Sequence, residues 1–197
     1  AIMCTIPWVK LIAIIREPVE RLFSHYNFLK DPTKHNADLA PFETFVQRDI
    51  KGLQHNGVLP KDLKQISSHM GSKAEADAYL KYQALHHGER QFIRSLYALQ
   101  LEGWERSLKR VGKDIRKDMR VVISSEVKSN PNVTRDLLDW LGLEPQPHEV
   151  REAMKTRYTS VPIDPKFKEY LNSIIAPYNK RLYNFLGKDY EGIFDQN

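Results

Sequence analysis

A short apolar run followed closely by a proline constrains the fold of this chain more than any other feature. The run is Leu11–Ile15, in which three of five residues are isoleucine, and Arg16 follows it directly. A run of this kind is typical of a strand that is buried on both faces, and such strands belong to parallel sheets. Glu17 and Pro18 come next, and proline suits the first turn of a helix. The segment therefore predicts a strand, a tight turn and a helix.

The centre of the chain predicts a helix between two strands. Residues 30–73 are polar and broken by proline and glycine, which favours a long excursion with short helices. Five apolar residues then recur at steps of four, four, three and four, as expected for one face of a long amphipathic helix: Ile93, Tyr97, Leu101, Trp104 and Leu108. Residues 120–124 read as a second short buried strand. A helix followed by a strand implies a parallel crossover.

The second half of the chain carries clear helix boundaries. Asn130 and Pro131 predict the start of a helix that ends at Gly142, because glycine favours the left-handed stop. Asp164 with the following proline predicts the start of another helix, which Pro177 interrupts. A final helix is expected to end at Gly187. We predict an α/β fold, a parallel sheet with flanking helices, in one domain over residues 1–197.

Composition narrows the function classes. The chain has 197 residues, of which 41% are hydrophobic and 28% charged, so it can bury a core and is not of the disordered class. The single cysteine, Cys4, excludes an intramolecular disulfide and a multi-cysteine metal site. His86 and His87 are adjacent, and adjacent side chains on a helix point about 100° apart, so we expect no metal. A net charge of +5 favours anionic partners.

The end of the first predicted strand is the candidate ligand site. Ligands of open parallel sheets bind beyond the carboxyl ends of the strands, where helix N-termini present backbone N–H groups to anions. Arg16 lies at that place, Ser24 follows on the next helix, and Arg21 could add charge. These residues predict a phosphate site. In the alternative interpretation Arg16 pairs with a neighbouring glutamate, and Ser24 hydrogen-bonds to its own helix.

The same residues resemble a known family. Residues 10–26, KLIAIIREPVERLFSHY, are similar to the sulfotransferase motif that binds the 3′-phosphate of 3′-phosphoadenosine 5′-phosphosulfate (PAPS), with Arg, Pro, Arg, Ser and Tyr at the family's spacing. Further segments agree in order, namely LYALQLEGW at 96–104, SE at 125–126, DWLGL at 139–143 and PYNKRLYNFLG at 177–187. The resemblance covers most of residues 10–190 and leaves about 30–90 unmatched. It implies a P-loop-nucleotidase-like fold.

The resemblance implies an activity and a set of site residues. The activity is transfer of a sulfuryl group from PAPS, as co-substrate, to a hydroxyl or amine of an acceptor, with carbohydrate favoured. Arg16 and Ser24 would hold the 3′-phosphate and Tyr97 would lie near the adenine, although a residue on an amphipathic face also suits plain core. Lys155 and Arg157 occupy the stretch of the family's late Lys-Gly-Arg loop and are candidates for phosphate contacts.

Two parts of the family's pattern are not found in the sequence. Its Gly-rich phosphosulfate loop and its catalytic Glu or His precede the arginine motif, and this sequence contains no such loop. We therefore expect the central and C-terminal portion of a larger protein, with an N-terminally incomplete fold, an unassigned catalytic base and no turnover by this chain alone. Two alternatives stay open: a non-catalytic nucleotide- or polyanion-binding module, and a kinase-like nucleotide enzyme of the same fold.

Partners and compartment follow from the resemblance and from short patterns. We expect an acceptor substrate, no nucleic acid, and no membrane contact by this segment, whose longest apolar run is far below the roughly 20 residues of a membrane span. Golgi relatives imply the Golgi lumen or, for a type II membrane protein, the Golgi membrane, with the cytoplasm as the alternative. Asn132-Val133-Thr134 fits the N-glycosylation pattern of a glycoprotein.

Overall fold

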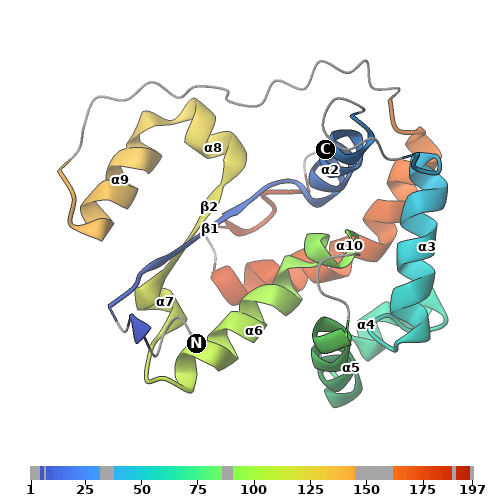
Figure 1. Cartoon of the computed structure of the whole chain (residues 1–197), viewed down its shortest axis with the longest axis horizontal. Coiled ribbons are helices and arrows are strands. Elements are labelled where there is room, and N and C mark those ends of the chain that lie inside the picture. The colour runs from blue at the N-terminus through green and yellow to red at the C-terminus, as the bar shows by residue number, and fades with distance from the viewer. Residues whose placement is uncertain are drawn as a thin grey trace. The chain divides into compact units, whose positions relative to one another are not determined.

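The computed structural model describes residues 5–6, 8–31, 38–85, 91–144, 162–187 and 190–195. The chain divides into two compact units, the first made of residues 1–16 and 101–155 and the second of residues 17–100 and 156–197. Figure 1 shows the elements in chain order, with two strands among many helices. The described part is therefore mostly helical.

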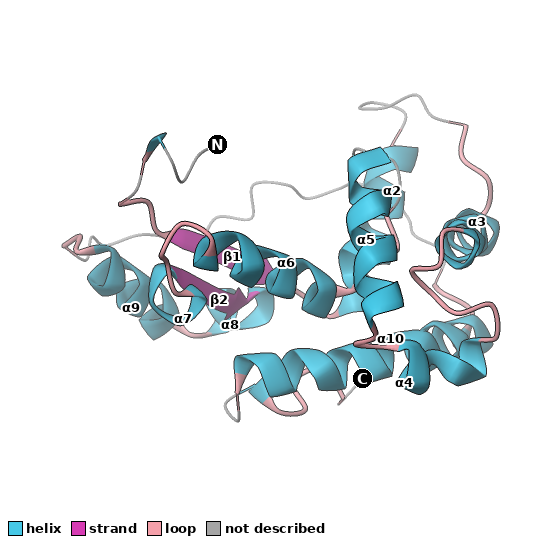
Figure 2. Cartoon of the chain, turned by 90° about the horizontal axis from the view of Figure 1, so that it is seen from below, coloured by secondary structure: helices cyan, strands magenta, loops and turns pink. Residues whose placement is uncertain are grey.

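The first unit contains a parallel pair of strands, β1 (Leu11–Ile15) and β2 (Met119–Ile123). The register runs from Leu11 opposite Met119 to Ile15 opposite Ile123, and Figure 2 draws the pair in magenta. The parallel pairing predicted from the sequence is confirmed. The other elements of the unit are α7 (Ile115–Asp118), α8 (Ser124–Ser129), α9 (Pro131–Leu141) and residues 101–109 of α6 (Tyr97–Lys109).

One face of β1 departs from the sequence prediction. Ile15 is buried, but Ile12 is 42% exposed and Ile14 is 62% exposed. Because side chains alternate along a strand, these two isoleucines share one face. No described residue covers that face fully, so the prediction that β1 is buried on both faces is wrong.

The boundaries of α9 agree with the sequence. Asn130 Oδ1 accepts a hydrogen bond from the backbone N–H of Asn132 at 3.0 Å, and Pro131 occupies the first turn. Gly142 ends the helix with φ of 76°, in the left-handed region that favours glycine. Both predicted boundaries are confirmed.

The second unit is helical throughout its described part. The excursion predicted to hold short helices contains α3, η1 and α4, and it continues into α5, which the sequence did not predict. The elements are α2 (Pro18–Lys30), α3 (Phe42–His55), η1 (Leu63–Gln65), α4 (Ile66–His69), α5 (Lys73–Leu85), η2 (Ile93–Ser95), residues 97–100 of α6 and α10 (Pro165–Leu186). Their apolar faces form one core, in which Leu22, Leu53, Phe92 and Leu171 are fully buried.

Helix α10 continues through a proline. It begins at the predicted cap, where Asp164 Oδ1 accepts from the N–H of Phe167 at 3.0 Å, and it ends at Gly187 as predicted. The predicted break at Pro177 is wrong, since one helix spans all 22 residues. Ile174 and Tyr178 are buried on either side of this proline. Their packing offsets the loss of one backbone hydrogen bond and the steric conflict that an internal proline brings.

The long amphipathic helix predicted around residues 93–108 is only partly correct. Ile93 lies in the short helix η2, and α6 begins at Tyr97 after a break in helical geometry at Leu96. Leu101 and Leu108 are buried, whereas Trp104 is 46% exposed. The periodic face is therefore shorter than the sequence pattern predicts.

A buried carboxylate joins α5 to α10. Glu75 is fully buried, and its Oε1 accepts from Tyr178 Oη at 2.8 Å. Its Oε2 accepts from the N–H of Gly71 at 2.7 Å and forms an ion pair with Arg181 Nη1 at 2.5 Å. Every oxygen of this buried group has a partner, as a buried charge requires. We call Glu75, Tyr178 and Arg181 the Glu75 cluster.

We expect the Glu75 cluster to make the free energy of unfolding fall at high pH. Burial raises the pKa of Tyr178 above its ordinary value of 10.0, and Glu75 raises it further. Above that ordinary value the unfolded chain releases a proton that the folded chain keeps, so the free energy of unfolding falls as pH rises, by up to about 1.4 kcal/mol per pH unit. Tyr178→Phe will have a shallower slope in urea denaturation between about pH 9 and 11. Equal slopes for the two proteins would contradict the assignment.

Candidate functional site

The candidate site starts where β1 ends. Arg16 follows the last residue of the strand and is exposed, and helix α2 begins two residues later at Pro18. Arg16 is the last residue of its segment in the first unit, and Glu17 is the first residue of the second unit. The predicted strand and helix are thus both confirmed.

A carboxylate already occupies the N-terminus of α2. Glu17 Oε1 accepts from the N–H of Val19 at 3.0 Å, and Oε2 accepts from the N–H of Glu20 at 2.5 Å. Pro18 has no N–H, and the N–H of Arg21 donates to the Glu17 carbonyl at 2.9 Å. The expectation that free backbone N–H groups of this helix bind the anion is therefore wrong. An anion here depends on side chains.

Ser24 has a hydroxyl available for a ligand. Its side chain is half-buried on α2, two residues after the buried Leu22. It forms no hydrogen bond with any described residue, so the predicted alternative of a bond to its own helix is not found. Arg16 and Ser24 belong to different units, and their convergence on one phosphate stays a prediction.

Arg21 has a structural role. Its Nε and Nη2 donate to Ser95 Oγ at 3.0 and 2.9 Å, and Nη2 also donates to the Gln91 carbonyl at 2.6 Å. Ser95 Oγ in turn donates to the Pro18 carbonyl at 3.0 Å. Burial lowers the pKa of the Arg21 guanidinium. The Nε and Nη2 groups therefore bond inside the unit, where they join α2 to the segment before α6.

A second buried group supports the same segment. Asp49, on α3, accepts from the N–H groups of Gln91 and Phe92 at 2.6 and 3.0 Å through Oδ2. With Arg21 and Ser95 it holds residues 91–96 in place, directly before Tyr97. Sequence reasoning did not single out Asp49 or Ser95, because neither lies in a periodic pattern or a spaced motif.

The structure describes one of the three remaining predicted site residues, Tyr97, but not Lys155 and Arg157. Tyr97 is buried at the start of α6, with its ring centroid 6.5 Å from that of Phe194. This position suits the core interpretation, and a contact with adenine stays a prediction. Lys155 and Arg157 lie outside the described residues.

No metal site or membrane span is found in the described ranges. No three of their His, Cys, Asp and Glu side chains are grouped closely enough to share a metal ion, and His86 and His87 are not among these residues. None of the described helices is both long enough and apolar enough to cross a bilayer.

Comparison with solved structures identifies the fold. The chain is similar to a sulfotransferase from Alicyclobacillus acidocaldarius, with a TM-score of 0.54 and 22% sequence identity. The alignment covers 94% of this chain and 57% of that chain, so this chain spans little more than half of that sulfotransferase. No protein-family model and no curated protein matches the sequence. The chain therefore shares a sulfotransferase fold, as the sequence resemblance implied.

Proposed function

We propose that this chain carries the nucleotide-binding part of a PAPS-dependent sulfotransferase. One observation carries the proposal: an exposed arginine follows β1, and a serine with an unused hydroxyl lies on the next helix, in a chain of sulfotransferase fold. The arginine motif of residues 10–26 supports the same assignment. The acceptor that we favour is a carbohydrate hydroxyl or amine, and the compartment that we favour is the Golgi.

The residues of this chain would bind and orient the nucleotide. PAPS supplies the sulfuryl group, and such transfers depend mainly on in-line positioning and on positive charge near the leaving phosphate. The planar guanidinium of Arg16 suits two oxygens of a 3′-phosphate, and the Ser24 hydroxyl can donate to a third. Glu17 takes up the N–H groups of α2, which makes these two side chains the main source of selectivity for the 3′-phosphate.

Calorimetric titration of the product nucleotide, 3′-phosphoadenosine 5′-phosphate, tests the proposal. We expect Arg16→Ala to weaken binding at least tenfold, because a charge-assisted hydrogen bond contributes about 1.5–3 kcal/mol. Ser24→Ala should weaken it about fivefold, as expected for one neutral hydrogen bond of about 1 kcal/mol. Arg48→Ala removes an equal charge from an exposed position on α3 and should leave binding unchanged.

Adenosine 5′-phosphate serves as the control ligand, since it lacks the 3′-phosphate. Wild-type protein should prefer the 3′-phosphorylated nucleotide, and Arg16→Ala should lose that preference. Equal binding of the two nucleotides by the wild-type protein would refute the 3′-phosphate site. Binding that requires Mg²⁺ would instead favour a kinase-like enzyme.

A further inference from the structure

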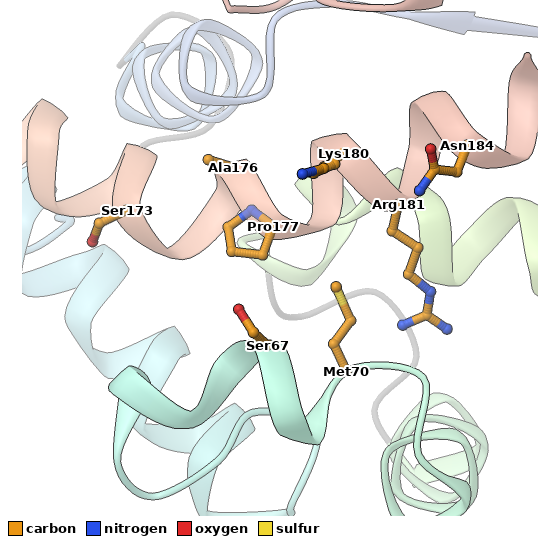
Figure 3. A pocket seen from close by; sticks show the side chains of 8 residues that line it. All are labelled: Ser67, Met70, Ser173, Ala176, Pro177, Lys180, Arg181 and Asn184. Carbon is orange, nitrogen blue, oxygen red and sulfur yellow. The ribbon is translucent and has the colours of Figure 1, made fainter. Parts of the chain in front are cut away.

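A cavity of about 610 Å³ lies between α4 and the exposed side of α10, within the second unit. Figure 3 shows Ser67 and Met70 extending from α4 and its end toward Pro177 on α10. The cavity is lined by Ser67, Met70, Ser173, Ala176, Pro177, Lys180, Arg181 and Asn184. Its volume falls within the range of about 300–1,000 Å³ that is usual for small-molecule sites.

The proline in α10 contributes an apolar surface to this cavity. Ser173 and Pro177 both line the cavity. Met70 and Ala176 also line it, and their side chains are apolar. The ligand should therefore have an apolar body.

The charge of the cavity is positive. Lys180 is exposed and forms no ion pair with any described residue. Arg181 also lines the cavity, but its charge is balanced by Glu75 at 2.5 Å, and the balanced pair keeps the guanidinium in place. None of the eight lining residues is acidic. Lys180 is thus an uncompensated cation beside the amide of Asn184, one helical turn away.

We propose that this cavity binds a small organic anion, in which a sulfate, phosphate or carboxylate group is attached to a compact ring. The anionic group contacts Lys180 and Asn184, and the ring packs on Met70 and Pro177. The lining residues include neither Arg16 nor Ser24, so the proposal stands whether or not the chain binds a nucleotide.

Phenyl sulfate is the probe, because it combines an anionic group with a compact ring. Amide NMR shifts of the full chain report where it binds. We expect saturable shifts at the lining residues. Lys180→Ala should weaken binding about tenfold, as expected for loss of a charge-assisted hydrogen bond. Lys166→Ala, an exposed lysine at the start of the same helix, should leave binding within about twofold, because it lies outside the cavity.

Two further measurements separate this site from general attraction to a basic protein. Phenol and inorganic sulfate, each carrying one half of the probe, should bind at least tenfold more weakly than phenyl sulfate. Ala176→Trp fills the cavity from an exposed position and should abolish binding while the charges stay in place. Absence of saturable shifts at the lining residues, or equal affinities of wild-type protein and Lys180→Ala, would overturn the proposal.

Discussion

Glu75→Ala will lower the free energy of unfolding by about 3–5 kcal/mol, the range for removing one partner of a buried ion pair. The substitution removes the 2.5 Å ion pair with Arg181 and the acceptor of Tyr178 Oη and of the N–H of Gly71. Since small domains are stable by only about 5–15 kcal/mol, this variant will be close to unfolding at room temperature. Urea denaturation followed by circular dichroism measures the change.

Two further variants show that the charge causes this loss. Asp77→Asn removes an exposed carboxylate from the same helix and should change stability by less than about 0.5 kcal/mol. Glu75→Leu combined with Arg181→Met should be more stable than Glu75→Leu alone, because the double variant also removes the partly buried positive charge that Glu75 balances. If Glu75→Ala loses less than about 1 kcal/mol, the cluster does not hold α5 on α10.

The parts of the fold that were predicted correctly depend on neighbours in the sequence. The caps at Asn130, Gly142 and Asp164 are local, since each satisfies backbone groups within a few residues. The β1 and α2 boundaries likewise follow from an apolar run and an adjacent proline. Such features can be predicted from the sequence because no distant residue is needed to form them.

The errors arise where distant residues decide the outcome. Pro177 would end an isolated helix, but the core around Ile174 and Tyr178 holds α10 together. A glutamate on a helix is usually exposed to solvent, so the sequence does not predict that Glu75 is buried. Its burial depends on contacts with Tyr178 and Arg181, which lie more than 100 positions away in the sequence. The exposed face of β1 is a tertiary property of the same kind.

In the candidate site, too, the local features could be predicted from the sequence and the contacts with distant residues could not. The sequence motif identified Arg16 and Ser24, but it could not show that Glu17 occupies the helix N-terminus instead of a ligand. It also offered Arg21 as a residue that could add charge beside Arg16. The structure separates them, because Arg16 is exposed and Arg21 is bound to Ser95 and Gln91.

Arg21→Ala will therefore lower the free energy of unfolding by about 2–4 kcal/mol, because it removes the three hydrogen bonds that Arg21 donates to Ser95 Oγ and to the Gln91 carbonyl. Arg21→Lys will recover only part of this loss, since an ammonium cannot reproduce the planar fork that reaches both acceptors. Arg16→Ala will change stability by less than about 1 kcal/mol, because the side chain is exposed.

Nucleotide titration completes the comparison of the two arginines. At a temperature where Arg21→Lys is folded, its affinity for 3′-phosphoadenosine 5′-phosphate should stay within about threefold of the wild-type value, whereas Arg16→Ala should lose at least tenfold. The two substitutions thus separate stability from binding, although both remove or alter a positive group that follows β1 closely in the sequence. If Arg21→Lys loses affinity as strongly as Arg16→Ala while keeping its stability, then Arg21 binds the phosphate and its contacts with Ser95 are not its main role.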